Sequence, residues 1–203
     1  INGKTQWGNE REFHHYGSTL NAVAVLDSYR AFPNRFHLLR LGTCALLGHL
    51  SNIHPNGAAS MAWHGDPGLL RRDAYSGDYG PGLYGYWRSA ASYVVCMPPY
   101  GWSCFLCDLD DPSAPTPDQT GATDGCDTNV KLRITPRDAF GRRAYLASIG
   151  LYITVDGASM TELLFAPSEN SVSIVLKPHS LAPSAEATLA LAVERIEPPP
   201  PGP

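Results

Sequence analysis

Apolar positions change their spacing about halfway along the chain, from the period of helices to the alternation of β-strands. In the first half, Ser18 can cap a helix that runs to about Ala31, where Pro33 stops it. Asn34 can cap a second helix from Arg35 to about Leu50. The link between them is short, which predicts an antiparallel helical hairpin.

Apolar stripes indicate which helical faces should be buried. On the second helix the stripe with three-and-four spacing comprises Leu38, Leu41, Ala45 and Leu46. A third helix is predicted from Pro81 to the residues before Pro98 and Pro99. Its stripe comprises Leu83, Tyr86, Trp87, Ala90 and Val94.

From Trp102 onward, apolar and polar residues alternate in short runs separated by turn-forming residues. Besides the strand that begins at Trp102, the runs are 130–134, 151–155, 161–165, 171–176 and 189–193. This pattern is typical of an antiparallel β-sandwich. Residues 108–129 are rich in Asp, Pro, Thr and Gly and predict a surface insertion, and residues 197–203 form a polyproline-like tail.

The expected fold class is therefore α+β, with helices leading into a sandwich. We expect residues 1–100 to be hairpins of an incomplete (α/α) toroid and residues 101–196 to be the sandwich domain. The chain holds too few helices to close a ring, and it begins at Ile1 without an initiator Met. We therefore expect an upstream polypeptide to complete the toroid and to cover the apolar faces of the helices.

Composition excludes several functional classes. The 203 residues are 43% hydrophobic and 17% charged, with a net charge of -4, and they contain no Lys/Arg run that would bind a nucleic acid. No apolar run approaches the ~20 residues that cross a bilayer, so no membrane partner is expected. Phosphate-binding and dinucleotide fingerprints are absent from the sequence, as is Gly-x-Ser-x-Gly, so no cofactor is expected.

The five cysteines favour an oxidising compartment and a secreted protein. Cys107 and Cys126 bracket the predicted insertion, so we expect a disulfide between them. Cys96 and Cys104 are the next most plausible pair, which leaves Cys44 as a buried thiol on its helix. Cys104-x-x-Cys107 has no second C-x-x-C to complete a zinc site.

Residues 73–88 are the best candidate for a functional site, because they combine carboxylates, five aromatic rings and several glycines. Aromatic faces stack on sugar rings while acidic and guanidinium groups bind hydroxyls. The candidates here are Tyr75, Asp78, Tyr79, Tyr84 and Arg88. Tyr/Gly-rich segments also occur in ordinary loops and cores, and Asp78 has an alternative role as the cap of the helix entered at Pro81.

Two other loops add candidates. The segment 7–17, just before the first helix, supplies Glu10, Glu12, His14, His15 and Tyr16. Adjacent histidines in an extended segment point opposite ways, so at most one should face a cleft. The segment 61–66 adds Trp63, His64 and Asp66. His64-x-Asp66 has no further ligand at metal-binding spacing, so no metal is expected.

Several motifs carry a resemblance to a known family: residues 75–83, 90–95, 101–105, 136–147 and 150–152. Over roughly residues 5 to 176, they look like a family of fungal and bacterial secreted proteins labelled only as a domain of unknown function. That family is similar in build to six-hairpin glycosidases, which join a helical toroid to β domains. The resemblance implies an architecture and a carbohydrate substrate, without a characterised active site.

The residues and the resemblance together predict a carbohydrate-active enzyme, namely a glycoside hydrolase that uses two carboxylates. Glu12 and Asp78 are the first candidates, followed by Glu10 and Asp66. A first alternative is a polysaccharide lyase, in which a Tyr or His removes a proton and Arg neutralises a uronate. Its candidates are His14, His15, Tyr16, Tyr79 and Arg88. A second alternative is a non-catalytic carbohydrate-binding or structural module.

Overall fold

A computed structural model of the chain describes residues 12–48, 62–64, 80–98, 100–110, 126–179 and 189–197, with the backbone alone at 12–18, 62–64 and 80–82. The chain divides into two compact units. The helical unit comprises residues 1–29 and 34–89, and the sandwich unit comprises residues 30–33 and 90–203.

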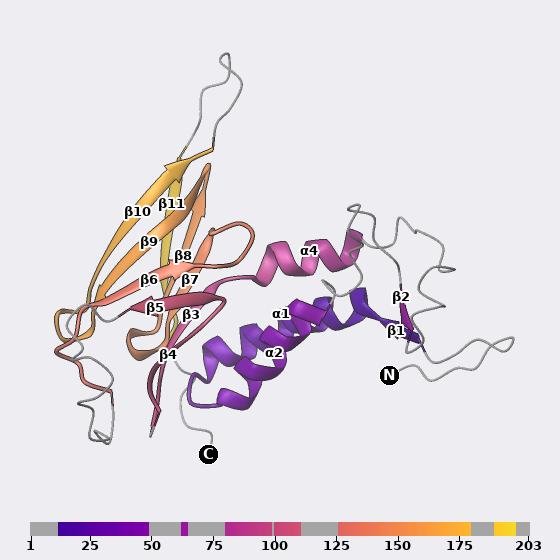
Figure 1. Cartoon of the computed structure of the whole chain (residues 1–203), viewed down its shortest axis with the longest axis horizontal. Helices are drawn as coiled ribbons and strands as arrows, with labels where there is room; N and C mark the ends of the chain where they lie inside the picture. Colours follow the sequence, from indigo (N-terminus) through magenta and orange to yellow (C-terminus); the bar gives the residue numbers. More distant parts are fainter. Residues whose placement is uncertain are drawn as a thin grey trace, which may run out of the picture. The chain divides into compact units, whose positions relative to one another are not determined.

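The described part of the helical unit contains the helices α1 (His15–Ala31), α2 (Phe36–Gly48) and α4 (Gly80–Ser89) (Figure 1). It also contains the short antiparallel strands β1 (Glu12–His14) and β2 (Ala62–His64). As predicted, α1 ends before Pro33 and α2 follows after a short link. The start of α1 differs from the prediction, because the helix begins three residues before Ser18.

Two glycines let α1 approach the other helices of this unit. A methyl group on Gly42 of α2 would lie 2.5 Å from the Leu26 side chain of α1. One on Gly85 of α4 would lie 2.7 Å from the carbonyl oxygen of Thr19 in α1. Both distances are shorter than a real carbon contact, so the helices pack at this separation only because these residues lack a side chain.

The buried face of α2 differs from the predicted one. Leu39, Gly42, Thr43 and Leu46 are buried, whereas Leu41 is exposed. The observed set also follows three-and-four spacing, rotated relative to the predicted stripe. The prediction was wrong because it assigned the small residues Gly42 and Thr43 to the outer face, although α1 packs against α2 at Gly42.

The predicted third helix is correct only to Ser89. Residues Ser92–Met97 form the strand β3, whose first four residues are all buried. A strand buried on both faces has a continuous apolar run, and such a run fits a helical stripe equally well. The aromatic and β-branched residues Tyr93, Val94 and Val95 favoured the strand.

The sandwich unit has two sheets (Figure 1). The four-stranded sheet has the order β10-β9-β6-β5, and all of its pairs are antiparallel. The five-stranded sheet has the order β11-β8-β7-β3-β4, in which β3 and β7 are parallel and the other pairs antiparallel. The strands after β3 are β4 (Gly101–Phe105), β5 (Cys107–Asp110), β6 (Leu132–Pro136), β7 (Arg143–Leu146), β8 (Leu151–Asp156), β9 (Ala158–Ala166), β10 (Ser171–Pro178) and β11 (Ala190–Arg195). Short 3-10 turns, η4 (Ala147–Ile149) and η5 (Pro167–Glu169), precede β8 and β10.

The two sheets share one apolar core. Val94, Ile153 and Val155 contribute from the five-stranded sheet, and Leu163 and Phe165 from the four-stranded sheet. These residues alternate along their strands with residues that point away from the core, as the period of two requires. The runs of alternating residues at 151–155, 161–165 and 171–176 are thus confirmed as strands β8, β9 and β10.

The predicted helical toroid is wrong. The described residues form a mostly β structure, with nine strands in the two sheets of the sandwich, the β1–β2 pair and three helices, and these helices make no toroid. The error followed from counting the buried strand β3 as helix and from treating one hairpin as part of a repeating series. None of the helices in the described ranges has the length and apolar character needed to cross a bilayer.

The disulfides exist, but the predicted pairing was wrong. Cys96 is bonded to Cys126, with 5.7 Å between the Cα atoms, and Cys104 is bonded to Cys107. Cys44 is a free thiol, as expected, but it is exposed rather than buried. The register of β3 with β4 explains the misassignment, because Cys104 lies opposite Val94, diagonal to Cys96.

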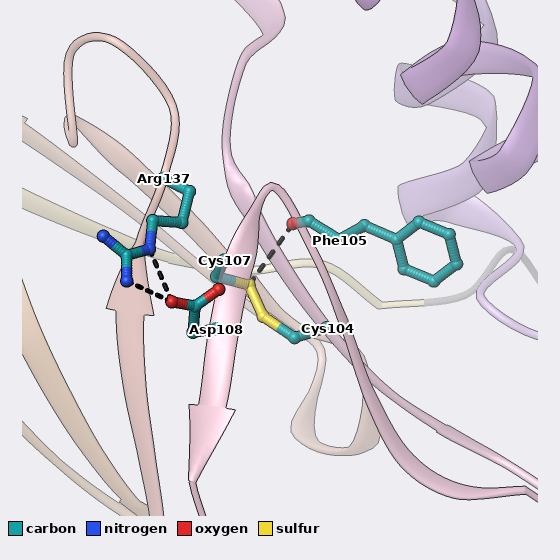
Figure 2. The surroundings of a disulfide bond; sticks show 5 residues. All are labelled: Cys104, Phe105, Cys107, Asp108 and Arg137. Atoms are coloured by element: carbon teal, nitrogen blue, oxygen red, sulfur yellow. Dashed lines mark hydrogen bonds and ion pairs between the residues drawn. A yellow bond between two sulfur atoms is a disulfide. The ribbon is translucent and has the colours of Figure 1, made fainter.

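The Cys104–Cys107 disulfide lies where the chain changes sheets. Leu106 alone connects β4 of one sheet to β5 of the other, and its φ of 58° is unusual for a residue with a side chain. The N–H of Arg137 donates to the Leu106 carbonyl at 2.8 Å. Figure 2 shows the Arg137 guanidinium paired with Asp108 beside the disulfide, and this hydrogen bond raises the pKa of Arg137. These contacts hold Leu106 in its strained conformation.

Candidate functional site

The predicted site residues fall into three groups. Glu10, Asp66, Tyr75, Asp78 and Tyr79 lie outside the described residues. Residues 12, 14, 15, 16, 63 and 64 lie in elements whose backbone is described. Tyr84 and Arg88 lie on α4 with their side chains described.

The β1–β2 pair brings together two segments that are about fifty residues apart in the sequence. Glu12 lies opposite His64, Phe13 opposite Trp63 and His14 opposite Ala62. Directly opposed positions share a face of an antiparallel pair, so positions 12 and 64 share one face and position 63 belongs to the other. The backbone therefore unites a carboxylate position and an imidazole position that the sequence presented as separate candidates.

His14 and His15 do not lie in one extended segment, contrary to the prediction. His14 is the last residue of β1, and His15 is the first residue of α1. Tyr16 follows in the first turn of α1. The change from strand to helix between the two histidines means that the alternation rule used to separate them does not apply here.

The outer face of α4 is the most exposed aromatic surface among the described helices. Tyr84 is 55% exposed and Trp87 is 38% exposed, with their ring centroids 6.0 Å apart and their planes inclined by 32°. Leu83, one helical turn before Trp87, is 51% exposed and extends the same surface. We call Leu83, Tyr84 and Trp87 the α4 aromatic face.

The opposite side of α4 explains this exposure. Gly85, Tyr86 and Ser89 are buried, and Gly85 lies against the backbone of α1 at Thr19. The prediction that Leu83 and Trp87 belong to the buried stripe was therefore wrong. Gly85 was the available signal, because a glycine inside a helix often marks the side on which another backbone approaches closely.

One charged residue, Arg88, lies one helical turn after Tyr84 on α4. Arg88 follows Trp87 in the last turn of α4 and is half-buried. A cation in the last turn interacts favourably with the negative end of the helix dipole, so its position is stabilised without a ligand. An amphipathic aromatic pair next to a guanidinium provides apolar stacking surfaces together with hydrogen-bond donors.

Ser159 and His179 in the sandwich form a pair that resembles a nucleophile with its base, and sequence reasoning missed them. Ser159 Oγ lies 3.0 Å from His179 Nε2. The Ser159 hydroxyl donates its proton to the carbonyl oxygen of Phe140 at 2.8 Å, so this proton is not shared with His179. The backbone N–H of His179 donates to the Gly157 carbonyl at 3.0 Å. The pair therefore joins the end of β10 to the start of β9, which is a structural role.

The sandwich unit has a cleft of about 420 Å³ between the turn at Gly150 and the residues after β11. Arg195, Glu197 and Asn170 are among its lining residues, and none of the predicted site residues is. Within the described ranges, no group of three His, Cys, Asp or Glu side chains is arranged to hold a metal ion. In the part of the chain that the structure describes, predicted site residues come together on α4, with Tyr84 and Arg88, and in the β1–β2 pair.

Comparison with known proteins identifies the family. Residues 2–197 match the family of unknown function DUF5695, so the chain belongs to that family. This membership carries no activity and no link to glycosidases or to secretion. No curated protein and no solved structure matches the chain.

Proposed function

We propose that this protein binds carbohydrate through the α4 aromatic face. The observation that supports the proposal is the exposed pair Tyr84 and Trp87, whose rings lie 6.0 Å apart on one side of a helix. Large aromatic side chains that stay exposed beside each other are uncommon on surfaces without a binding role. Exposed aromatic rings of this kind supply apolar faces on which sugar rings stack.

Arg88 adds hydrogen-bond donors at the end of this surface. The planar guanidinium has five N–H donors, so it binds vicinal hydroxyls or a carboxylate of an acidic sugar. We expect stacking on Tyr84 and Trp87 to supply most of the affinity and Arg88 to supply orientation. Shallow surfaces of this kind bind weakly for each ring, in the range of roughly 1 mM.

Affinity electrophoresis in gels that contain neutral or acidic polysaccharides tests this proposal. Tyr84→Ala and Trp87→Ala should each abolish retardation, and the loss of thermal stability should be smaller for Tyr84, which is 55% exposed, than for Trp87, which is 38% exposed. Tyr100→Ala is the matched control, because Tyr100 is an exposed aromatic of the sandwich unit, at 82%. Equal retardation of the Trp87→Ala variant and the unaltered protein would rule out the proposal.

A second candidate function is glycoside hydrolysis by two carboxylates, with Glu12 as one of them. The register that places position 12 opposite position 64 favours it, because it brings a carboxylate position and an imidazole position to the same place in one strand pair. Asp78 is the proposed second carboxylate, with Glu10 or Asp66 as replacements, and these three lie outside the described residues.

Reducing-end release from the polysaccharide that binds tests hydrolysis. Glu12→Gln and Asp78→Asn should lose turnover while binding persists, because an amide keeps the shape of the carboxyl group but cannot cycle a proton. If Asp78 only caps a helix, Asn caps nearly as well and turnover survives. Release of products that absorb as unsaturated uronates would assign the lyase chemistry instead, and binding without any turnover would assign the non-catalytic module.

An extracellular location is part of the same proposal. The two disulfides are compatible with it, because such bonds persist in oxidising compartments. Finding the protein only in the reducing cytosol of its source cells, with all five thiols free, would contradict it. The predicted upstream polypeptide partner stays a prediction.

A further inference from the structure

Among the described residues the sandwich has four edge strands, and two of them, β5 and β10, carry features that oppose pairing with another strand. The strand β5 is four residues long and has Asp108 and Asp110. The strand β10 has a bulge between Val175 and Leu176, and it ends in Lys177 and Pro178. The edge strand β4 carries none of these features, but its Trp102 indole N–H donates to the Asp127 carbonyl at 2.8 Å, so the segment after Cys126 lies beside it. Short length, charge, bulges and proline all block edge-to-edge association.

The fourth edge, β11, has none of these features. Its six residues contain neither Lys nor Pro, its register with β8 runs without a bulge, and every one of them is exposed. Glu194 and Arg195 are its charged residues, and their charges cancel. Within the described part of the chain, this regular and exposed edge without net charge is open to pairing with another strand.

The apolar side of β11 continues the core of the sandwich. Leu191 lies opposite Val155 and Val193 opposite Ile153, and both partners are fully buried in the core. Yet Leu189, Leu191 and Val193 are themselves 53%, 52% and 53% exposed. The row of apolar side chains on this face of the sheet therefore extends one strand beyond the part that is covered.

The hydrogen-bonding groups of β11 alternate between β8 and the free edge. The Ile196 N–H donates to the Gly150 carbonyl at 2.8 Å, so the even-numbered residues direct their backbone groups toward β8. The N–H and C=O groups of Leu191, Val193 and Arg195 consequently face the free edge. Leu189 extends the same series at the start of the strand.

We propose that β11 pairs antiparallel with β11 of a second copy of this chain, about a two-fold axis at Ala192. In this register Leu191 lies opposite Val193 of the second copy, and both belong to the apolar face. Their free backbone groups form a hydrogen-bonded pair on each side of the axis. Ala192 lies opposite its own copy in a non-hydrogen-bonded pair, where the Cα atoms come closest and a small residue fits.

Charge and packing favour this register over its neighbours. Glu194 lies opposite Ala190, and Arg195 opposite Leu189, so no like charges oppose each other. Centring the pair on Val193 would leave one apolar pair, Val193 with its own copy, in place of the two Leu191–Val193 pairs, and centring it on Glu194 would oppose two carboxylates. Because the strand complements itself, a second copy suits this edge better than an unrelated strand.

Sedimentation of the whole chain between roughly 1 and 100 μM tests the pairing, since an interface this small should dissociate in the micromolar range. Val193→Pro removes an N–H that faces the free edge and leaves the ladder to β8 intact, so it should weaken the dimer at least tenfold. Val193→Thr keeps the N–H and is the matched control. A monomer throughout this range, or a dimer that survives Val193→Pro, would overturn the proposal.

Cross-linking tests the register itself and does not depend on the proline variant folding. In a Cys44→Ser background, Ala192→Cys should form an intermolecular disulfide, because opposed Cα atoms in such a pair lie about 4.5 Å apart. Ala190→Cys is the control, since two copies of residue 190 would lie roughly 13 Å apart. Equal cross-linking of both variants would overturn the register. If the protein is a monomer and the Leu191 and Val193 amides still resist hydrogen exchange, another segment of the chain pairs with this edge, and the proposal is overturned.

Discussion

In the sandwich unit, buried side chains from both sheets fill one core and two disulfides cross-link its strands, whereas in the helical unit α1 meets α2 and α4 at two glycines. The sandwich therefore distributes its stability over many contacts. The helical unit depends on close approach at Gly42 and Gly85, and α4 leaves its aromatic face exposed. The sandwich unit therefore holds the shared core and the covalent links, whereas the proposed binding surface belongs to the helical unit.

The largest expected effect comes from truncating the sandwich core. Phe165 is fully buried, and its ring packs edge-to-face against Trp102 at 5.9 Å. Phe165→Ala should destabilise the protein by about 3–5 kcal/mol, because it leaves a cavity between the sheets. Urea unfolding followed by tryptophan fluorescence measures it, and Val175→Ala on the half-exposed edge is the control. A loss below about 1 kcal/mol would mean that the core is not the main source of stability.

Removing a disulfide should have the next largest effect on stability. Replacing Cys96 and Cys126 by serine opens a loop with a sequence separation of 30 residues and should cost about 3–4 kcal/mol on chain entropy. Replacing Cys104 and Cys107 opens a loop with a sequence separation of 3 residues and should cost about 2 kcal/mol. The same unfolding measurement compares the two double variants. Equal losses, or a larger loss for the short loop, would show that strain at Leu106 and not loop length decides the effect.

Folding stability should decrease at high pH because of Tyr145 in the sandwich unit. Burial raises the pKa of Tyr145 to about 12, although the nearby Arg30 guanidinium opposes the shift. The folded state therefore disfavours the phenolate, and stability present below pH 10 should fall by about 2–3 kcal/mol as the pH rises to 12.

Unfolding measured from pH 9 to about 12 for the protein and for Tyr145→Phe isolates this contribution. The Tyr145 hydroxyl also donates to the Arg30 carbonyl at 3.0 Å, so the variant should start about 1 kcal/mol lower. The two stability curves should then converge as the pH increases and cross before about pH 12. Parallel curves would show that Tyr145 does not titrate in this range.

The smallest effect is expected in the helical unit. Gly85→Ala would place a methyl group 2.7 Å from the Thr19 carbonyl oxygen, and separating the helices should cost about 1–3 kcal/mol. Gly48→Ala is the matched control, because its methyl group would meet nothing within 4 Å. Carbohydrate retardation should fall together with stability in Gly85→Ala. If both glycine variants behave alike, the close approach of α1 and α4 does not hold the unit together.

Local signals in the sequence were sufficient for part of the fold. Pro33 marks the end of α1, and alternation over 151–155 and 171–176 marks β8 and β10, because each signal acts within a few residues. The strand β3 was missed because burial on both faces removes the alternation. The role of Tyr84 as a site residue stays a prediction, and Trp87, which lies beside it, was assigned to the buried side of α4 although it is exposed.

By itself, the sequence determined the chemical inventory of this protein: its aromatic and acidic segments, its cysteines and the alternating strands of its second half. Only the tertiary structure decided which cysteines bond, which side of α4 faces α1, and that Glu12 lies opposite His64. These outcomes depend on strand register and on contacts between residues far apart in the chain. Periodicity within one segment predicts neither the register nor these contacts, because it shows only which residues of that segment lie on the same face.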